Sequence, residues 1–151
     1  MKKLTVIFLG LAMVGSMAIA AAAMFTKPEE AISYRKATMT LIGHHFSRMG
    51  GVVKGEAEYA PAAVGRDADL VVVFSKLPWE AFMTAGSDKG DTRMKAEALQ
   101  NSEDFEAAAK AMEDETAKLA EILETGDQEA FKAQFGAAAQ SCKSCHSRFR
   151  S

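Results

Sequence analysis

The sequence predicts an all-α protein, an antiparallel four-helix bundle. After the first 23 of its 151 residues, the chain is rich in Ala, Glu, Lys, Met and Gln, which favour helices, and poor in β-branched residues. Apolar residues recur at alternating intervals of four and three, the spacing of helices that pack at about 20° in bundles. A short connection at residues 125–127 makes the last two helices antiparallel neighbours.

The first two helices are delimited by proline and glycine. The first is expected to begin at Pro28, because proline and the acids after it suit a first turn, and to end at Gly50-Gly51. The second is expected over residues 61–77, before Pro78, although the β-favouring run 71–73 leaves a short strand open. Their expected apolar stripes are Arg35, Met39, Ile42, Phe46 and Met49, and then Ala63, Leu70, Val73, Phe74 and Leu77.

A long loop separates these helices from the last two. Residues 83–101 carry glycines and short polar residues, which predicts a loop with a helical start near Thr92, and loops of this length are often functional. The third helix is expected over 102–124, capped by Ser102, and the fourth from 127 to about 149. Their stripes are Phe105, Ala109, Met112, Thr116, Leu119 and Leu123, and then Phe131, Phe135, Ala138, Cys142, Cys145 and Phe149.

Residues 1–23 have the layout of a cleaved signal peptide. Lys2 and Lys3 precede an uncharged apolar run that ends in small residues, so residues 24–151 would form the mature bundle domain. A membrane anchor is the alternative, because the run to Phe25 is about long enough to span a bilayer. The alanines at its end and the lack of a stop-transfer charge cluster favour cleavage, which predicts export to the periplasm.

The charge balance argues against a nucleic-acid partner. The formal net charge is −2 for the full chain and −4 without Lys2 and Lys3, which gives no basic footprint for nucleic acid. After removal of the leader, nothing in the mature sequence predicts a membrane association.

A C-x-x-C-H motif lies near the end of the fourth helix. Cys142 and Cys145 share one helix face, so two thiols can add to two vinyl groups at one haem edge, and His146 can reach the iron from the same side. A dithiol redox pair, a zinc site with His44 or His45, and a disulfide are the alternatives. A dithiol redox motif usually opens a helix, whereas this motif closes one. A zinc site would lack a fourth ligand at standard spacing, and a disulfide would close too short a loop to be stabilising. These points favour one covalent haem c.

Three other residues lie where they could contact that haem. Met39 can face the far side of the iron, as sixth ligand or steric plug, or simply pack in the core. Arg35, one turn earlier on a buried stripe, needs a counter-charge that a haem propionate would supply, unless it lies at the rim of a helix end. Arg150, one turn after the motif histidine, lies against the proximal imidazole or in solvent. His44 and His45 lie off or beside the stripe and are disfavoured as ligands.

Four segments together resemble cytochrome c-prime, a class II cytochrome c. They are KPEEAISYRKATMTLIGHHFSRM (27–49), VVKGEAEY (52–59), LPWEAF (77–82) and SCKSCHSRFR (141–150), so the resemblance covers the whole mature domain. It implies a four-helix bundle with one covalent haem c, a periplasmic homodimer, and His146 as the only protein ligand of a five-coordinate, high-spin iron. By position, Arg35, Lys36 and Asp91 would contact the haem, Met39 and Phe82 would line its distal pocket, and Arg150 would lie near its proximal face.

The expected function is therefore binding and electron transfer, not enzymatic catalysis. The resemblance implies a crowded distal face that admits NO and CO, and an apolar far side stabilises bound O₂ poorly. The protein would also exchange electrons with redox partner proteins. The alternative is a low-spin electron carrier, because low-spin members of the class bind iron through a methionine at the position of Met39.

Overall fold

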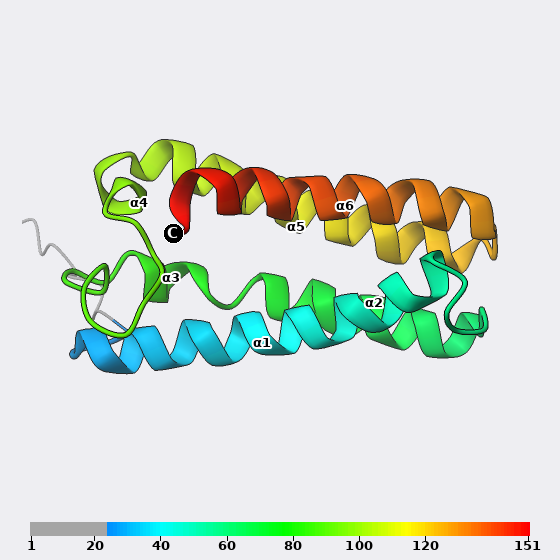
Figure 1. The fold of residues 1–151 in the computed structure, drawn as a ribbon, viewed down its shortest axis with the longest axis horizontal. Coiled ribbons are helices and arrows are strands. Elements are labelled where there is room, and N and C mark those ends of the chain that lie inside the picture. The colour runs from blue at the N-terminus through cyan, green and yellow to red at the C-terminus, as the bar shows by residue number, and fades with distance from the viewer. Residues whose placement is uncertain (1–23) are drawn as a thin grey trace, which may run out of the picture.

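Four long helices form the body of the protein. The computed structural model describes residues 24–151, so the predicted signal peptide, residues 1–23, lies outside the described residues. Successive long helices run in opposite directions (Figure 1), which confirms the predicted all-α, antiparallel bundle. Their bounds are α1 (Pro28–Val53), α2 (Pro61–Ser75), α5 (Ser102–Glu124) and α6 (Gln128–Phe149), with the short α3 (Trp79–Phe82) and α4 (Glu97–Gln100) between α2 and α5.

The helix ends follow the sequence signals with several differences. α2 ends at Ser75, two residues before the predicted end, and α4 lies within the predicted loop. α1 runs through Gly50 and Gly51, because Gly50 is a packing glycine: a Cβ there would lie 3.3 Å from the ring of Phe135 on α6. Ser102 is the first residue of α5 and not its cap. No helix starts near Thr92, since the chain there is extended and pairs with the C-terminal residues. The predicted fourth-helix start is confirmed: the Asp127 side chain accepts hydrogen bonds from two backbone amides of the first turn.

The buried face of α2 differs from the predicted one. Residues 71–73 are helical, and the prediction that Leu70, Val73 and Leu77 face the core is wrong: they are exposed by 37%, 56% and 41%. Polar residues occupy part of the buried face, since Asp67 pairs there with His45 (Nδ1–Oδ1 2.9 Å). The buried residues are Val64, Asp67, Ala68, Val71 and Ser75.

Two apolar clusters fill the bundle. All six predicted stripe residues of α5 are buried. The main cluster joins α1, α2, α5 and α6, and a smaller one, centred on Met94, Ala98, Phe105 and Phe149, lies where α6 ends. α1 packs on α2, α2 on α5 and α5 on α6, whereas α1 and α6 contact each other much less. Among residues 24–151, no helix is long and apolar enough to cross a membrane.

Candidate functional site

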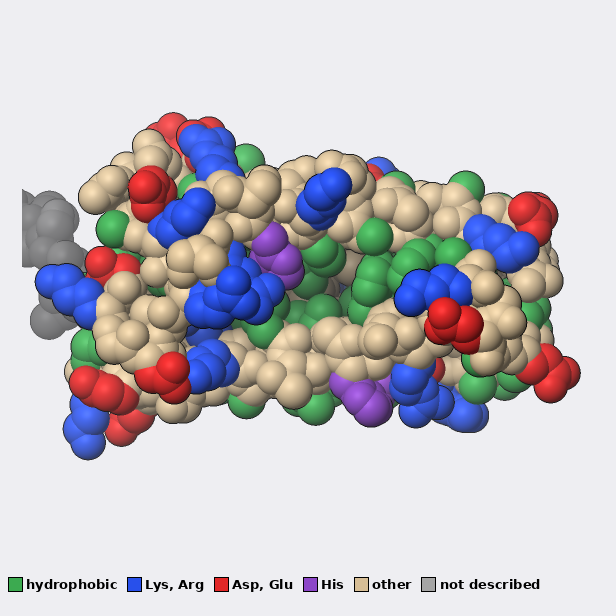
Figure 2. Space-filling model, in the orientation of Figure 1, with side chains coloured by type: hydrophobic (Ala, Val, Ile, Leu, Met, Phe, Trp, Pro, Cys, Tyr) green, Lys and Arg blue, Asp and Glu red, His purple; other side chains and the backbone are tan. Residues whose placement is uncertain are grey.

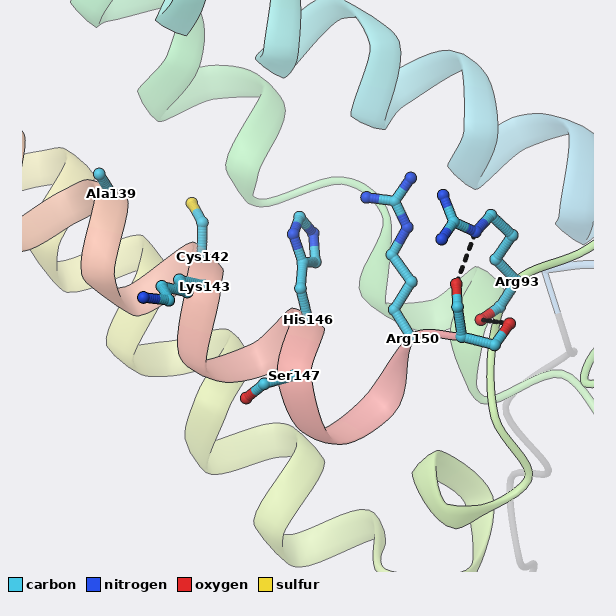
Figure 3. A pocket seen from close by; sticks show the side chains of 8 residues that line it. Arg93, Ala139, Cys142, Lys143, His146, Ser147 and Arg150 are labelled. Carbon is cyan, nitrogen blue, oxygen red and sulfur yellow. Dashed lines mark hydrogen bonds between the residues drawn. The ribbon is translucent and has the colours of Figure 1, made fainter.

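The C-x-x-C-H motif lines a cavity on the open side of α6. The cavity has a volume of about 490 Å³, and Cys142 and His146 project into it from one face of the helix, toward α1 (Figure 3). Cys142 and Cys145 are free thiols, both half-buried. The cavity is lined by Arg93, Ala139, Cys142, Lys143, His146, Ser147, Arg150 and Ser151. Cys142 and His146 thus face the cavity, whereas Cys145 does not line it and packs against the smaller apolar cluster around Phe149.

The two thiols are poor nucleophiles in this setting. Burial raises the pKa of Cys142 and that of Cys145 above the ordinary value, so both stay protonated at neutral pH, unlike the thiolate of a dithiol redox enzyme. Within the part of the chain that the structure describes, no cluster of three or more His, Cys, Asp or Glu side chains could hold a metal ion. The dithiol and zinc interpretations thus lack support.

α1 and α6 carry apolar side chains that the main core does not fully cover. Four predicted stripe residues remain half-exposed: Met39 and Phe46 on α1, and Phe135 and Cys142 on α6. Ile42 and Ala138, which lie between the members of each pair, are buried. Figure 2 shows this face of the molecule hollowed, with hydrophobic side chains in the hollow and basic ones gathered beside it. Apolar walls, two adjacent thiols and one imidazole fit a covalently attached haem.

His146 is tuned toward its neutral form. Its side chain is still exposed to the cavity, and partial burial of the ring is the main cause that lowers its pKa below the ordinary value. The positive charges of Arg150 and Arg93 lower the pKa further. A neutral imidazole is the form that binds a metal, so the local charges favour the role predicted for this residue.

Arg93 is a cavity residue that the sequence analysis missed. Its Nε donates to the backbone oxygen of Ser151 (2.6 Å), and its own carbonyl accepts from the Ser151 amide (2.9 Å). An antiparallel bridge between Met94 and Arg150 continues this pairing, so the two arginines stand side by side at the cavity (Figure 3). The contact joins segments more than 50 residues apart, and no local pattern in the sequence signals it. Arg150 shares the cavity with His146, as its spacing predicts.

Arg35 is buried, but its partners are neutral. The side chain is 2% exposed and donates four hydrogen bonds to residues 81–92. Its guanidinium also lies over the ring of Phe82, 4.9 Å from the centroid. Burial lowers the pKa of Arg35, and nearby Asp88 opposes that shift. The predicted contacts of Arg35 with a propionate and of Phe82 with the distal pocket remain predictions.

Lys36 and Asp91 pair with each other. Lys36 Nζ lies 2.6 Å from Asp91 Oδ2, with both side chains exposed, at the edge of a second hollow between α1 and the loop. The hydrogen bond and charge of Lys36 hold the pKa of Asp91 below its ordinary value. Their predicted haem contact stays a prediction. His45 is engaged by Asp67 on α2, and His44 is exposed.

Comparisons with known proteins agree with this geometry. The family model described as Cytochrome C' matches residues 30–150. Cytochrome c' of Alcaligenes xylosoxydans xylosoxydans is 37% identical over 126 residues, covering 83% of this chain and 97% of the relative. That of Rubrivivax gelatinosus is 36% identical over 127 residues, covering 83% and 98%. Among solved structures, cytochrome c prime from Shewanella frigidimarina superposes with a TM-score of 0.81 at 39% identity, covering 83% of this chain and 98% of that one.

The match spans nearly all of the described residues and includes the C-x-x-C-H motif at the cavity. Members of the matched family bind haem c, which accounts for the two thiols and the imidazole on one face of α6. The chain therefore belongs to the cytochrome c' family, and its haem c is attached through Cys142 and Cys145.

Proposed function

We propose that this protein is an exported haem c protein that binds NO and CO and passes single electrons, with His146 as the only protein ligand of its iron. The observation that carries the proposal is the placement of Cys142 and His146 in a cavity that faces α1 (Figure 3), with the half-buried Cys145 one helical turn after Cys142. The protein acts as a ligand binder and electron carrier, not as an enzyme.

A haem held by these residues would supply an iron that binds a diatomic ligand at an open coordination position and that has two accessible oxidation states. The chain supplies the rest. Cys142 and Cys145 tether the group, and His146 is held neutral for ligation by partial burial and two neighbouring cations. Met39 on the facing helix α1 is half-buried against the main core, where it can restrict access to the open position.

Relatives support the gas-binding part of the proposal. Solved structures of cytochrome c prime from Alcaligenes xylosoxidans include nitric oxide complexes of variants, at a TM-score of 0.76 and 37% identity. Another variant of the same relative was solved with carbon monoxide bound. The present chain shares the fold and the attachment motif with those proteins, so the same ligands are expected here.

The optical spectrum of the holoprotein tests the coordination state. A high-spin, five-coordinate ferrous spectrum near neutral pH, converted by NO and by CO, is expected. A six-coordinate, low-spin ferrous spectrum without added ligand would instead support the alternative, a dedicated electron carrier with Met39 bound to iron. Met39→Leu separates the two, because it keeps the bulk but removes the sulfur: only a ligating Met39 would give a spectrum that becomes high-spin in the variant.

A homodimer in the periplasm completes the proposal. Leu41 on α1 and Leu70, Val73 and Leu77 on or just after α2 are exposed apolar side chains on two helices that pack together. A second copy is the occupant that we propose for this surface, because apolar residues exposed in this number typically mark an interface.

Export is tested by the mass of the mature protein from a periplasmic extract, which should lack residues 1–23. Redox partner proteins would meet the haem in that compartment.

A further inference from the structure

The guanidinium of Arg35 binds one loop. Nη1 donates to the carbonyl of Ala81 (3.2 Å) and to Ser87 Oγ (2.8 Å), while Nη2 donates to the carbonyl of Ser87 and to Thr92 Oγ1 (2.7 Å). All four acceptors are neutral and lie 46 to 57 residues away in the sequence. Among the ion pairs formed within residues 24–151, none involves Arg35.

These bonds hold the loop strongly. Hydrogen bonds from an ionised donor are roughly twice as strong as neutral ones. Because Arg35 is 2% exposed, loss of its acceptors would leave a buried charge without partners, which is costly. Gly86 and Gly90 have positive φ angles, +79° and +87°, so this part of the chain turns without helix or strand bonds of its own. Arg35 therefore fixes residues 81–92 from inside the fold, beside the loop's own turn hydrogen bonds and the exposed Lys36–Asp91 pair.

Thr92 carries this constraint to the haem site. Its Oγ1 accepts both from Arg35 Nη2 (2.7 Å) and from the backbone amide of Met94 (3.1 Å). The chain is thus fixed on both sides of Arg93, whose side chain enters the cavity lined by His146 and Arg150. The bridge from Met94 to Arg150 extends the same support to the second arginine.

We propose that Arg35 is a positioning residue that acts through this loop: by binding Ser87 and Thr92, it holds Arg93, and through the bridge Arg150, beside the iron ligand. The inference rests on the proposed haem ligation by His146. Two fixed cations near the iron favour its ferrous over its ferric form, because the ferric site carries one more positive charge. Arg93 is solvent-exposed and is kept beside His146 by its hydrogen bonds to Ser151; once released, it would spend time farther from the iron, where salt screens its charge.

Thr92→Val in the holoprotein is the primary test, since valine keeps the shape and removes only the hydroxyl. Thr84→Val is the matched control, because Thr84 lies in the same loop and its hydroxyl donates only within its own turn, to the carbonyl of Glu80 (3.3 Å). The measurements are the midpoint potential, by spectroelectrochemical titration, and amide hydrogen exchange over residues 84–95.

The expected result has two parts. Thr92→Val raises the ferric-to-ferrous ratio at a fixed potential two- to tenfold, where tenfold corresponds to a fall of about 59 mV for one electron, and it speeds amide exchange around Arg93. Thr84→Val changes neither quantity. Arg93→Gln shifts the potential in the same direction, and the double variant Thr92→Val/Arg93→Gln shifts it by less than the sum of the two single shifts, because only the contribution of Arg150 is left for Thr92→Val to change.

Three outcomes would overturn the proposal. The first is a Thr92→Val protein whose midpoint potential and amide exchange equal those of the wild type. If Arg35→Met nevertheless lowers the potential, Arg35 acts by direct contact with a propionate and not through the loop. The second is full additivity of Thr92→Val and Arg93→Gln. The third is an equal effect of Thr84→Val. Failure of the proposed function is distinguishable, because the optical spectrum of the wild type would then show no five-coordinate haem. The exchange comparison between Thr92→Val and Thr84→Val would still report whether Arg35 holds the loop.

Discussion

Met39→Ala should speed the binding of CO without abolishing the fold. Met39 lies on α1 and is half-buried against the main core cluster, so part of its side chain is left exposed. If it restricts the open side of the haem, an entering ligand must push it out of its preferred rotamer, which costs about 0.5–1.5 kcal/mol. Removing that barrier corresponds to a rise of about two- to tenfold in the association rate.

The stability cost of this change should be moderate. Replacing a fully buried methionine by alanine costs about 2–5 kcal/mol, and a half-buried one should cost about half of that. Flash photolysis of the ferrous CO complex gives the association rate, and denaturant unfolding gives the free energy. Met49→Ala is the matched control: Met49 lies on the same stripe, is fully buried in the main cluster and should lose more stability while binding CO at the wild-type rate. An unchanged CO rate in Met39→Ala would refute the role of Met39 as a steric plug.

Three further predictions address the interface, the loop and the cofactor. Leu70→Glu should convert the dimer to monomer in sedimentation equilibrium, because it places a charge within the exposed apolar surface, whereas Ala111→Glu on the exposed side of α5 should not. Lys36→Gln should raise the pKa of Asp91 to its ordinary range, measured by NMR titration of the diamagnetic ferrous CO complex. The stabilisation that Lys36 provides is present above that range and disappears as the pH falls through the lowered pKa. The free energies of unfolding of wild type and variant should therefore converge in acid. Replacing both motif cysteines by alanine should leave a protein largely without haem and much less stable, measured by pyridine haemochrome assay and thermal unfolding, because a haem site without its haem is a large cavity.

The sequence predicts the parts of this fold that local patterns determine. The α5 stripe and the spacing of the motif along α6 follow from helix periodicity, and the Asp127 cap follows from the type of its side chain. The structure agrees with the stripe and the cap, and it places Cys142 and His146 at one cavity. The face of α2 could not be predicted in this way. Hydrophobicity alone places Leu70 inside and Asp67 outside, but the burial of Asp67 is made possible by partners on α1, His45 and Arg48. A pattern within one helix carries no information about such partners.

The same limit applies to the haem site. The two attachment thiols and the imidazole proposed as iron ligand lie within five residues of one another, so a motif reveals them. Arg93, by contrast, reaches the cavity only because the loop pairs with the C-terminal residues. Arg35 illustrates the limit differently: its position on a buried stripe signals a special partner, yet the acceptors that the structure provides are neutral loop atoms that no charge pattern predicts.

The half-exposed positions on α1 and α6 connect the fold with the function. In α5, which packs against neighbours along its length, every stripe residue is buried, whereas Met39, Phe46, Phe135 and Cys142 are not, although they follow the same spacing. Helices with such stripes would normally close on each other along their length. α1 and α6 meet where Phe46 stacks on Phe135, with ring centroids 4.3 Å apart, but otherwise they contact each other little. The sequence thus encodes a bundle with one interface left for a cofactor. Because the attachment thiols lie on that same stripe, the residues that would otherwise pack the helix instead bind the haem, and folding and haem attachment depend on one surface.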